Sequence, residues 1–200
     1  MNMTSLRETD HNIIYGNITI GNGGNNTNAR STLTANAVVN GSVVSQTLGS
    51  APIFLTSSTG STTHQTGTLN IRLSSANLSA PHTGITTWTN DVTLSGTKQQ
   101  ATITLDRGDG ISSGFTHQMD ELTLSGATRN LTVTASNGST LEFTGNTTLT
   151  HTAATTQTLN VSAGTLAVNN VGESGVGAKG RCGRAVSAGQ LLRSATSRPS

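Results

Sequence analysis

Short apolar segments recur through the run from Glu121 to Asn169, and each alternates apolar residues with Thr, Asn or Glu. The segments are Leu122/Leu124, Leu131/Val133, Leu141/Phe143, Leu149, Leu159/Val161 and Leu166/Val168. Alternation with a period of two residues is typical of a strand with one buried face. Gly, Asn, Ser and Thr separate the segments, as expected for tight turns, and no stretch has the period of a helix. The pattern predicts an all-β fold made of short strands.

One part of the pattern repeats. The segment Asp91–Gly96 reads Asp-Val-Thr-Leu-Ser-Gly and returns 30 residues later as Glu-Leu-Thr-Leu-Ser-Gly in Glu121–Gly126. Another predicted strand follows each copy, at Thr102–Leu105 and Leu131–Thr134. A unit of this length with about three strands is what one turn of a β-solenoid requires. An antiparallel β-sandwich also uses short alternating strands, but the scarcity of large core residues and hairpin signals favours a parallel β-helix.

The pattern divides the chain into three parts. Residues 1–12 are polar and predict an irregular N-terminal segment, and residues 13–177 form the predicted β-solenoid region. In its first half, strands are expected at Ile13–Ile20, Ala37–Val44, Ile53–Leu55 and Thr68–Leu73. The alternation stops after Val171, and the Arg-, Gly- and Ser-rich residues 178–200 predict a basic, disordered tail.

The amino-acid composition indicates what kind of hydrophobic core the chain can form. Only 32% of the residues are apolar and 2% are aromatic, well below the usage of ordinary globular domains. Disordered chains are usually rich in Pro, Glu and Lys, whereas here Pro is scarce and Val, Ile, Leu and Thr recur in register. The composition therefore indicates a thin, stacked core of small residues.

The net charge of +2 is unevenly distributed along the chain. Five of the 11 basic residues are Lys179, Arg181, Arg184, Arg193 and Arg198, and all nine acidic residues come before them. The body of the chain is therefore acidic and has no basic stripe interleaved with aromatic residues, so no nucleic-acid partner is expected. Cys182 is the only cysteine, which excludes an intramolecular disulfide. No apolar run reaches transmembrane length, so this segment is not expected to insert directly into a membrane.

The segments Leu141–Thr147 and Val161–Asn169 resemble the autotransporter-associated β-strand repeat, found in passenger domains of bacterial autotransporters and related surface adhesins. The most specific part is Ala163–Asn169, Ala-Gly-Thr-Leu-Ala-Val-Asn. The resemblance implies a right-handed parallel β-helix that is exported and displayed at the bacterial cell surface. It also implies a structural or adhesive role, with host-cell or surface glycans or proteins as partners. The export signal and the translocator would lie outside this chain.

The tripeptide Arg107-Gly108-Asp109 is the candidate adhesion motif, because it follows the predicted strand Thr102–Leu105 on a Gly-containing turn. The alternative is an ordinary polar turn, since Gly and Asp are turn residues in any case. Asp106 and Asp109 could also contribute oxygen ligands to Ca²⁺. The Gly-Gly-x-Gly-x-Asp ladder of calcium-binding β-rolls is absent, so neither a metal site nor a cofactor is predicted.

The sequence predicts no catalytic residues. The only dense carboxylates are Asp106, Asp109, Asp120 and Glu121, and a carbohydrate-active β-helix enzyme would require them to converge in one groove. The five histidines have no ligand-like spacing and are expected on the surface or in turns; they are His11, His64, His82, His117 and His151. Trp88 could be a platform for a sugar ring, but a packing role is favoured.

Thr-x-Thr steps recur at Thr102/Thr104, Thr132/Thr134 and Thr148/Thr150/Thr152. Threonine is a common solvent-facing residue of strands, so these steps alone are compatible with any exposed sheet. They are also compatible with an ice-binding solenoid, which would require one flat face of aligned rows. The leading hypothesis is therefore a structural or adhesive β-solenoid of a bacterial surface protein, with a carbohydrate-active enzyme and an ice-binding solenoid as alternatives.

Overall fold

The computed structural model describes residues 17–21, 30–40, 43–46, 48–56, 66–77, 81–95, 99–126, 129–152, 157–176 and 186–187. The predicted N-terminal segment 1–12 lies outside these residues, as does the predicted tail 178–200 apart from Val186 and Ser187. The described part of the chain contains 17 strands and no helix. A membrane-spanning helix is therefore not found in this part of the chain.

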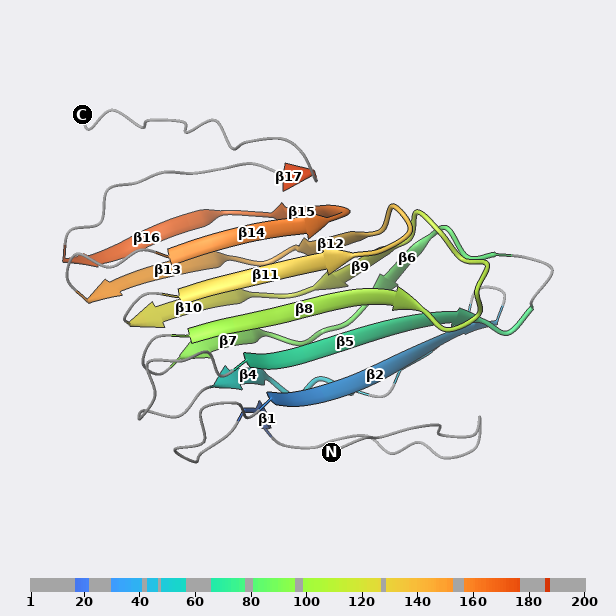
Figure 1. Ribbon diagram of the computed structural model, residues 1–200, viewed down its shortest axis with the longest axis horizontal. Coiled ribbons are helices and arrows are strands. Elements are labelled where there is room, and N and C mark those ends of the chain that lie inside the picture. Colours follow the sequence, from blue (N-terminus) through green and yellow to red (C-terminus); the bar gives the residue numbers. More distant parts are fainter. Residues whose placement is uncertain are drawn as a thin grey trace.

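The strands form three sheets (Figure 1). Sheet A contains β1 (Ile18–Ile20), β4 (Ile53–Thr56), β7 (Val92–Ser95), β10 (Leu122–Gly126), β13 (Thr147–Thr152) and β16 (Val171–Val176). Sheet B contains β3 (Val43–Gln46), β2 (Arg30–Asn40), β5 (Thr66–Ser75), β8 (Gln99–Arg107), β11 (Arg129–Ala135) and β14 (Gln157–Ala163). Sheet C contains β6 (Ile85–Thr87), β9 (Thr116–Met119), β12 (Thr140–Phe143), β15 (Thr165–Val168) and β17 (Val186–Ser187).

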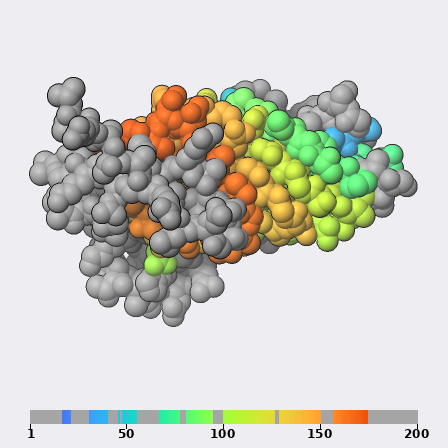
Figure 2. Space-filling model, turned by 90° about the horizontal axis from the view of Figure 1, so that it is seen from above, coloured from blue at the N-terminus to red at the C-terminus, as the bar shows by residue number. Residues whose placement is uncertain are grey.

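The chain winds through the three sheets in turn, so that successive coils stack in parallel. In sheet A, Val92 pairs with Leu122 and Leu94 pairs with Leu124, which places the two copies of the sequence repeat directly beside each other. In Figure 2 the coils follow one another as bands of colour across the surface. The prediction of a parallel β-helix is confirmed, and the alternative of an antiparallel sandwich is wrong, because the pairing between coils is parallel in all three sheets.

Two short strands depart from the parallel rule. β3 pairs antiparallel with β2, and β17 pairs antiparallel with β15. The predicted strand Ala37–Val44 is therefore wrong as a single strand, since its residues belong to both β2 and β3. The Asn40-Gly41 step between them is a hairpin signal that separates the two apolar segments. β17 falls within the region predicted as a tail.

The apolar alternation stops after Val171, but a strand follows within the predicted β-solenoid region 13–177. β16 covers the glycine-containing stretch after Val171, where the apolar alternation has stopped, yet it pairs with β13 from Thr147↔Val171 to Thr152↔Val176. Glycine is unfavourable in a strand interior by itself. β16 is therefore held in a strand conformation by its backbone hydrogen bonds with β13, and its own side-chain pattern does not predict it.

Parallel register places similar apolar residues on top of one another inside the coils. One inward column of sheet A contains only leucine in four successive coils, namely Leu55, Leu94, Leu124 and Leu149. In sheet B the corresponding column is Leu33, Leu69, Ile103 and Val133. Because each coil buries its inner face against its neighbours, the columns form one continuous core.

Alanine contributes to this core at positions outside the predicted apolar segments. Ala35, Ala37, Ala101 and Ala135 are all at most 2% exposed and point inward. β2 begins at Arg30, well before the predicted start at Ala37. Within it, Ala35 and Ala37 alternate with polar residues, as inward residues of a strand do. A core of small residues was predicted, and the alanines show where the narrow parts of the coil lie.

From the coil that begins at Ile53 onward, the coils become shorter along the chain. In sheet A, Ile53 pairs with Val92, 39 residues later, whereas Thr147 pairs with Val171 after only 24 residues. Much of the difference lies in the corner between sheets B and C. This corner spans residues 76–84, then 108–115, then 136–139, and finally only Gly164. The early coils therefore carry large corner loops on a body whose later coils turn with almost none.

Gly164 makes the tightest of these corners. Its φ is +74°, and a Cβ at this position would lie 2.6 Å from the Ser139 carbonyl oxygen and would also overlap Ala135. Thr165 N–H donates to the same Ser139 oxygen at 3.1 Å, which fixes the corner against the previous coil. Only glycine meets both requirements, the left-handed backbone and the close approach.

We expect Gly164→Ala to destabilise the fold much more than Gly138→Ala. Gly138 has a similar φ of +70°, but a Cβ there would meet nothing within 4 Å. Gly138→Ala should therefore cost only the left-handed backbone, about 1–2 kcal/mol, whereas Gly164→Ala adds a backbone overlap and should cost about 3 kcal/mol or more. Urea unfolding followed by far-UV circular dichroism measures both free energies. Equal losses in the two variants would contradict the close approach at Gly164.

Candidate functional site

The corner loop of residues 108–115, between β8 and β9, carries the candidate adhesion motif. Gly108 N–H donates to the Leu73 carbonyl oxygen at 2.6 Å, which ties the loop to the end of β5 in the preceding coil. A Cβ on Gly108 would overlap the Ser74 hydroxyl, so the loop lies directly against that coil. Gly110 and Gly114 have positive φ angles of 76° and 63° and allow the chain to reverse.

The Asp109 carboxylate is the centre of this loop. Its Oδ2 accepts hydrogen bonds from Ser75 N–H and from the Ser112 hydroxyl, both at 2.6 Å. Its Oδ1 accepts from the backbone N–H groups of Ile111 at 3.0 Å and Ser112 at 2.9 Å. Burial raises the pKa of Asp109, but hydrogen bonds from Ser112, Ser75 and Ile111 outweigh it and hold that pKa well below the usual range. The carboxylate therefore joins two coils and organises its own turn.

The arginine of the motif also bonds within the loop. Arg107 Nη1 donates to the Ser112 carbonyl oxygen at 3.4 Å, and Arg107 N–H donates to Asp106 Oδ1 at 2.8 Å. Asp106 in turn lies 3.9 Å from Arg72 on the neighbouring strand. Arg107, Gly108 and Asp109 are thus adjacent at one corner, with the acid directed into the loop. Attachment through this motif stays a prediction, and it would require Asp109 to exchange four hydrogen bonds for a ligand.

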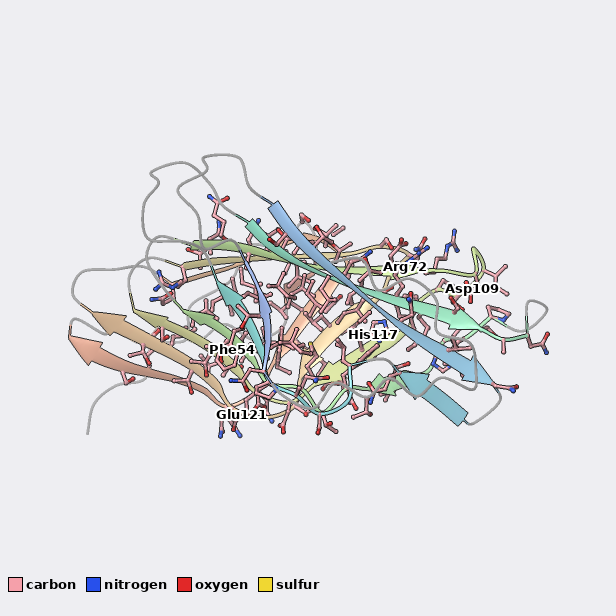
Figure 3. All side chains as sticks on the ribbon, turned by 90° about the horizontal axis from the view of Figure 1, so that it is seen from below. Phe54, Arg72, Asp109, His117 and Glu121 are labelled. Carbon is pink, nitrogen blue, oxygen red and sulfur yellow. The ribbon has the colours of Figure 1, made fainter. Side chains whose placement is uncertain are left out.

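The carboxylates named in the enzyme hypothesis lie at two different corners. Asp106 lies near the end of β8, and Asp109 lies in the corner loop that follows β8. Asp120 and Glu121 lie at another corner, between β9 and β10, where the chain passes from sheet C to sheet A. Figure 3 shows Asp109 and Glu121 well apart, with His117 between them. The convergence that a carbohydrate-active enzyme requires is not found among these four residues. Within the described residues, no group of three or more His, Cys, Asp or Glu side chains could hold a metal ion.

His117 is fully buried, so the prediction of a surface or turn position is wrong for this residue. It lies in the core beside Trp88 and Phe115, with edge-to-face ring contacts at centroid distances of 5.7 and 5.2 Å. Trp88 is itself 0% exposed, which confirms the packing interpretation and leaves no ring face for a sugar. His117 occupies an inward position of β9 and pairs with Leu141 of β12. In the sequence, only its alternation with polar neighbours indicates that it is buried. His82 is half-buried, His11 and His64 lie outside the described residues, and the side chain of His151 is also outside them.

The hydrogen bond between Trp88 and His117 fixes the protonation state of the imidazole. Trp88 Nε1–H donates to His117 Nδ1 at 3.0 Å, so Nδ1 carries a lone pair and the neutral ring keeps its proton on Nε2. Burial lowers the pKa of His117 to about 3, with a smaller contribution from the nearby His82. A metal at Nε2 would require both ring nitrogens to be deprotonated, so this geometry disfavours a metal ligand and favours a structural role.

Polar atoms without a partner lie close to this ring in the fold. His117 Nε2, the Thr86 hydroxyl and His82 Nε2 are buried and form no hydrogen bond within the described part of the chain. Thr86 is the register partner of His117 in sheet C, so these two groups belong to the same inward column. Buried polar groups of this kind commonly share an ordered water molecule. The arrangement is a polar interruption of an apolar core.

The outer face of sheet B presents two of the three predicted Thr-x-Thr steps in alignment, whereas the third, Thr148/Thr150/Thr152, lies on β13 of sheet A. Thr102 pairs with Thr132, and Thr104 pairs with Thr134. Further along the sheet, Thr68 pairs with Thr102. The sequence alone predicts the steps in β8 and β11, whereas only the pairing of the strands shows that β2 and β5 place threonine in the same rows.

No protein-family model matches the chain, and neither does any curated protein or solved structure. The resemblance of Ala163–Asn169 to the autotransporter-associated repeat therefore stays a prediction. In the fold this segment contains the Gly164 corner and β15, which explains the Gly and the alternating apolar residues on physical grounds alone.

We expect His117→Leu to remove part of the acid sensitivity of the fold. The folded-state pKa of about 3 lies below the ordinary value of 6.5. The stability linked to neutral His117 is therefore complete above pH 6.5 and is lost as the pH falls towards 3. Between pH 6.5 and 5, where carboxylates stay ionised, the wild-type chain should lose roughly 1.5 kcal/mol more than the variant.

Urea unfolding at several pH values measures this difference. Loss of the Trp88 hydrogen bond lowers the stability of His117→Leu at every pH, so the slope against pH is the quantity to compare. Parallel curves for the two proteins would show that His117 does not stay neutral in the folded state.

We expect Asp109→Asn to lower the free energy of unfolding by about 1–2 kcal/mol, because the amide nitrogen cannot accept the hydrogen bonds that one carboxylate oxygen now receives. Asp120→Asn is the matched control, since Asp120 is exposed at the other corner and should change the stability by less than about 0.5 kcal/mol. Chemical denaturation measures both. If the two variants are equally stable, Asp109 does not hold the coils together.

Proposed function

We propose that the chain is a structural segment of a bacterial surface protein, in which the β-solenoid serves as a stiff support for exposed loops. The observation that carries this proposal is the unbroken parallel stacking of sheet A from β1 to β16 (Figure 1). Each added coil lengthens such a stack by about 4.8 Å, the spacing between neighbouring strands. A stack of this kind gains length in proportion to its coils and needs no separate domain core.

The corners support a mechanical role. Between sheets C and A, Ile53 N–H donates to the Asp91 carbonyl oxygen at 2.8 Å and Val92 N–H donates to that of Glu121 at 2.8 Å. Side chains add further links, since Asn146 Nδ2 donates to Glu121 Oε1 at 3.1 Å and Asn169 Nδ2 donates to the Thr144 carbonyl oxygen at 3.1 Å. Hydrogen bonding between coils therefore continues where the sheets end, and the stack resists bending at its corners.

Recognition would fall on the corner loops. The described residues 81–84 lie next to the loop 108–115 of the following coil, since His82 N–H donates to the Ser112 hydroxyl at 3.0 Å. Arg107 lies beside these corner residues. A host-cell or surface glycan or protein would bind here if the role is adhesive. The stacked strands then hold these loops in place.

The surface location is testable with an antibody raised against this chain. Intact cells of the bacterium that encodes the chain should label in flow cytometry, and permeabilising the cells should increase the signal little. An antibody against a cytosolic protein of the same cells serves as the control and should label only after permeabilisation. Labelling of this chain only after permeabilisation would overturn the proposal.

A further inference from the structure

Ten outward positions of sheet B form two adjacent columns, which we call the threonine array. The first column contains Thr32, Thr68, Thr102, Thr132 and Asn160, and the second contains Thr34, Asn70, Thr104, Thr134 and Ser162. Seven of these ten residues are threonine. Their side chains point away from the core, because they alternate along each strand with buried residues such as Leu69 and Ile103.

The array has a regular spacing in two directions. Neighbouring strands lie about 4.8 Å apart, and next-but-one residues along a strand lie about 6.7 Å apart. The β-branched side chain of threonine has few rotamers, so its methyl and hydroxyl groups repeat with the backbone. At the end of the second column, a register shift after Val133 pairs Thr134 with Ala163 instead of Ser162. The hydroxyl oxygens of Thr134 and Ser162 nevertheless lie 2.6 Å apart, so the row of hydroxyl groups continues across the shift.

No member of the array carries a charge. The nearest charged pair is Arg72 and Asp106, which are separated by 3.9 Å and occupy the next column along the same strands. A charged side chain holds its own hydration shell and would disturb an ordered layer of water. The array is thus a patch of methyl, hydroxyl and amide groups with a charged edge on one side.

We propose that the threonine array binds ice. The oxygen atoms on a prism face of ice form rows whose two repeats are close to the spacing of strands and the spacing of alternate residues in a sheet. Hydroxyl groups on such a grid can take the places of water molecules in the lattice, while the methyl groups between them favour an ordered water layer over bulk water. Because the sheet fixes the grid in advance, little entropy is lost on binding.

Sheet B is better suited to this role than the other two sheets. The outward positions of sheet C include Gln118 and Glu142, whose side chains bond to each other at 2.7 Å and place a carboxylate in the rows. In sheet A, Phe54 interrupts the column that contains Thr93 and Thr123. Sheet B also has the longest strands, and Figure 1 shows β5, β8, β11 and β14 running nearly parallel while β2 turns away. The strands of the array are therefore best aligned over these four.

Partition into ice tests the proposal with the full chain. Ice is grown slowly through a solution of the protein, and the fraction of protein enclosed is compared with that of serum albumin as an inert reference. We expect the chain to be enriched in the ice and the albumin to be excluded. Thr102→Lys, in the centre of the array, should reduce the enrichment by roughly tenfold, because the charged side chain keeps the lattice away from its neighbours.

Thr123→Lys on sheet A is the matched control, and it should leave the enrichment unchanged. Thr102→Ser, which keeps the hydroxyl and removes the methyl, should reduce the enrichment less than Thr102→Lys does. Far-UV circular dichroism confirms that each variant is folded. Exclusion of the wild-type chain from ice, or equal losses for Thr102→Lys and Thr123→Lys, would overturn the proposal, whatever the cellular location of the protein.

Discussion

In-register parallel stacking of the coils is the constraint on which the rest of this structure depends. Backbone hydrogen bonds join each strand to its counterpart one coil away, and they continue at the corners, where Leu122 N–H donates to the Asn146 carbonyl oxygen at 3.0 Å. The environment of a residue is therefore set by the residues directly above and below it. Leucine columns inside and threonine columns outside are two results of the same rule, since a coil that departed from it would place polar groups in the core.

Variation is confined to the corners, where it does not disturb this register. The connection between sheets B and C shortens from residues 76–84 to Gly164 alone, while the flanking strands keep their partners. A long loop needs its own internal bonds, and Asp109 supplies them for residues 108–115. A short corner needs a permissive backbone, and Gly164 supplies that. His117 is one of several buried polar residues inside the coils, Asn90 and Arg129 being others. Its hydrogen bond with Trp88 satisfies one of its two nitrogens.

Much of the architecture could be predicted from the sequence, because the repeated Asp91–Gly96 and Glu121–Gly126 segments are spaced by one coil. The pattern was less informative where a residue depends on its neighbour in space. Ala35 and β16 are ordered by the adjacent coil, and their own side chains give little signal. Arg107-Gly108-Asp109 was recognised as a motif, but the direction of the Asp109 side chain depends on Ser75 and Ser112, which sequence spacing does not bring together. The same holds for His117, since burial of a single histidine has no pattern of its own.

The shortening of the coils has a consequence for how the chain reaches this structure. Residues that pair in sheet A are separated by 39 positions at Ile53↔Val92 but by only 24 at Thr147↔Val171. The entropy lost in closing a loop grows with its length, so the later coils close more readily than the earlier ones. Once one coil has formed, its edge provides hydrogen-bonding groups for the next, and order can spread from coil to coil. The later coils, with their small corners, are thus suited to serve as the starting template on which the larger, loop-bearing coils assemble.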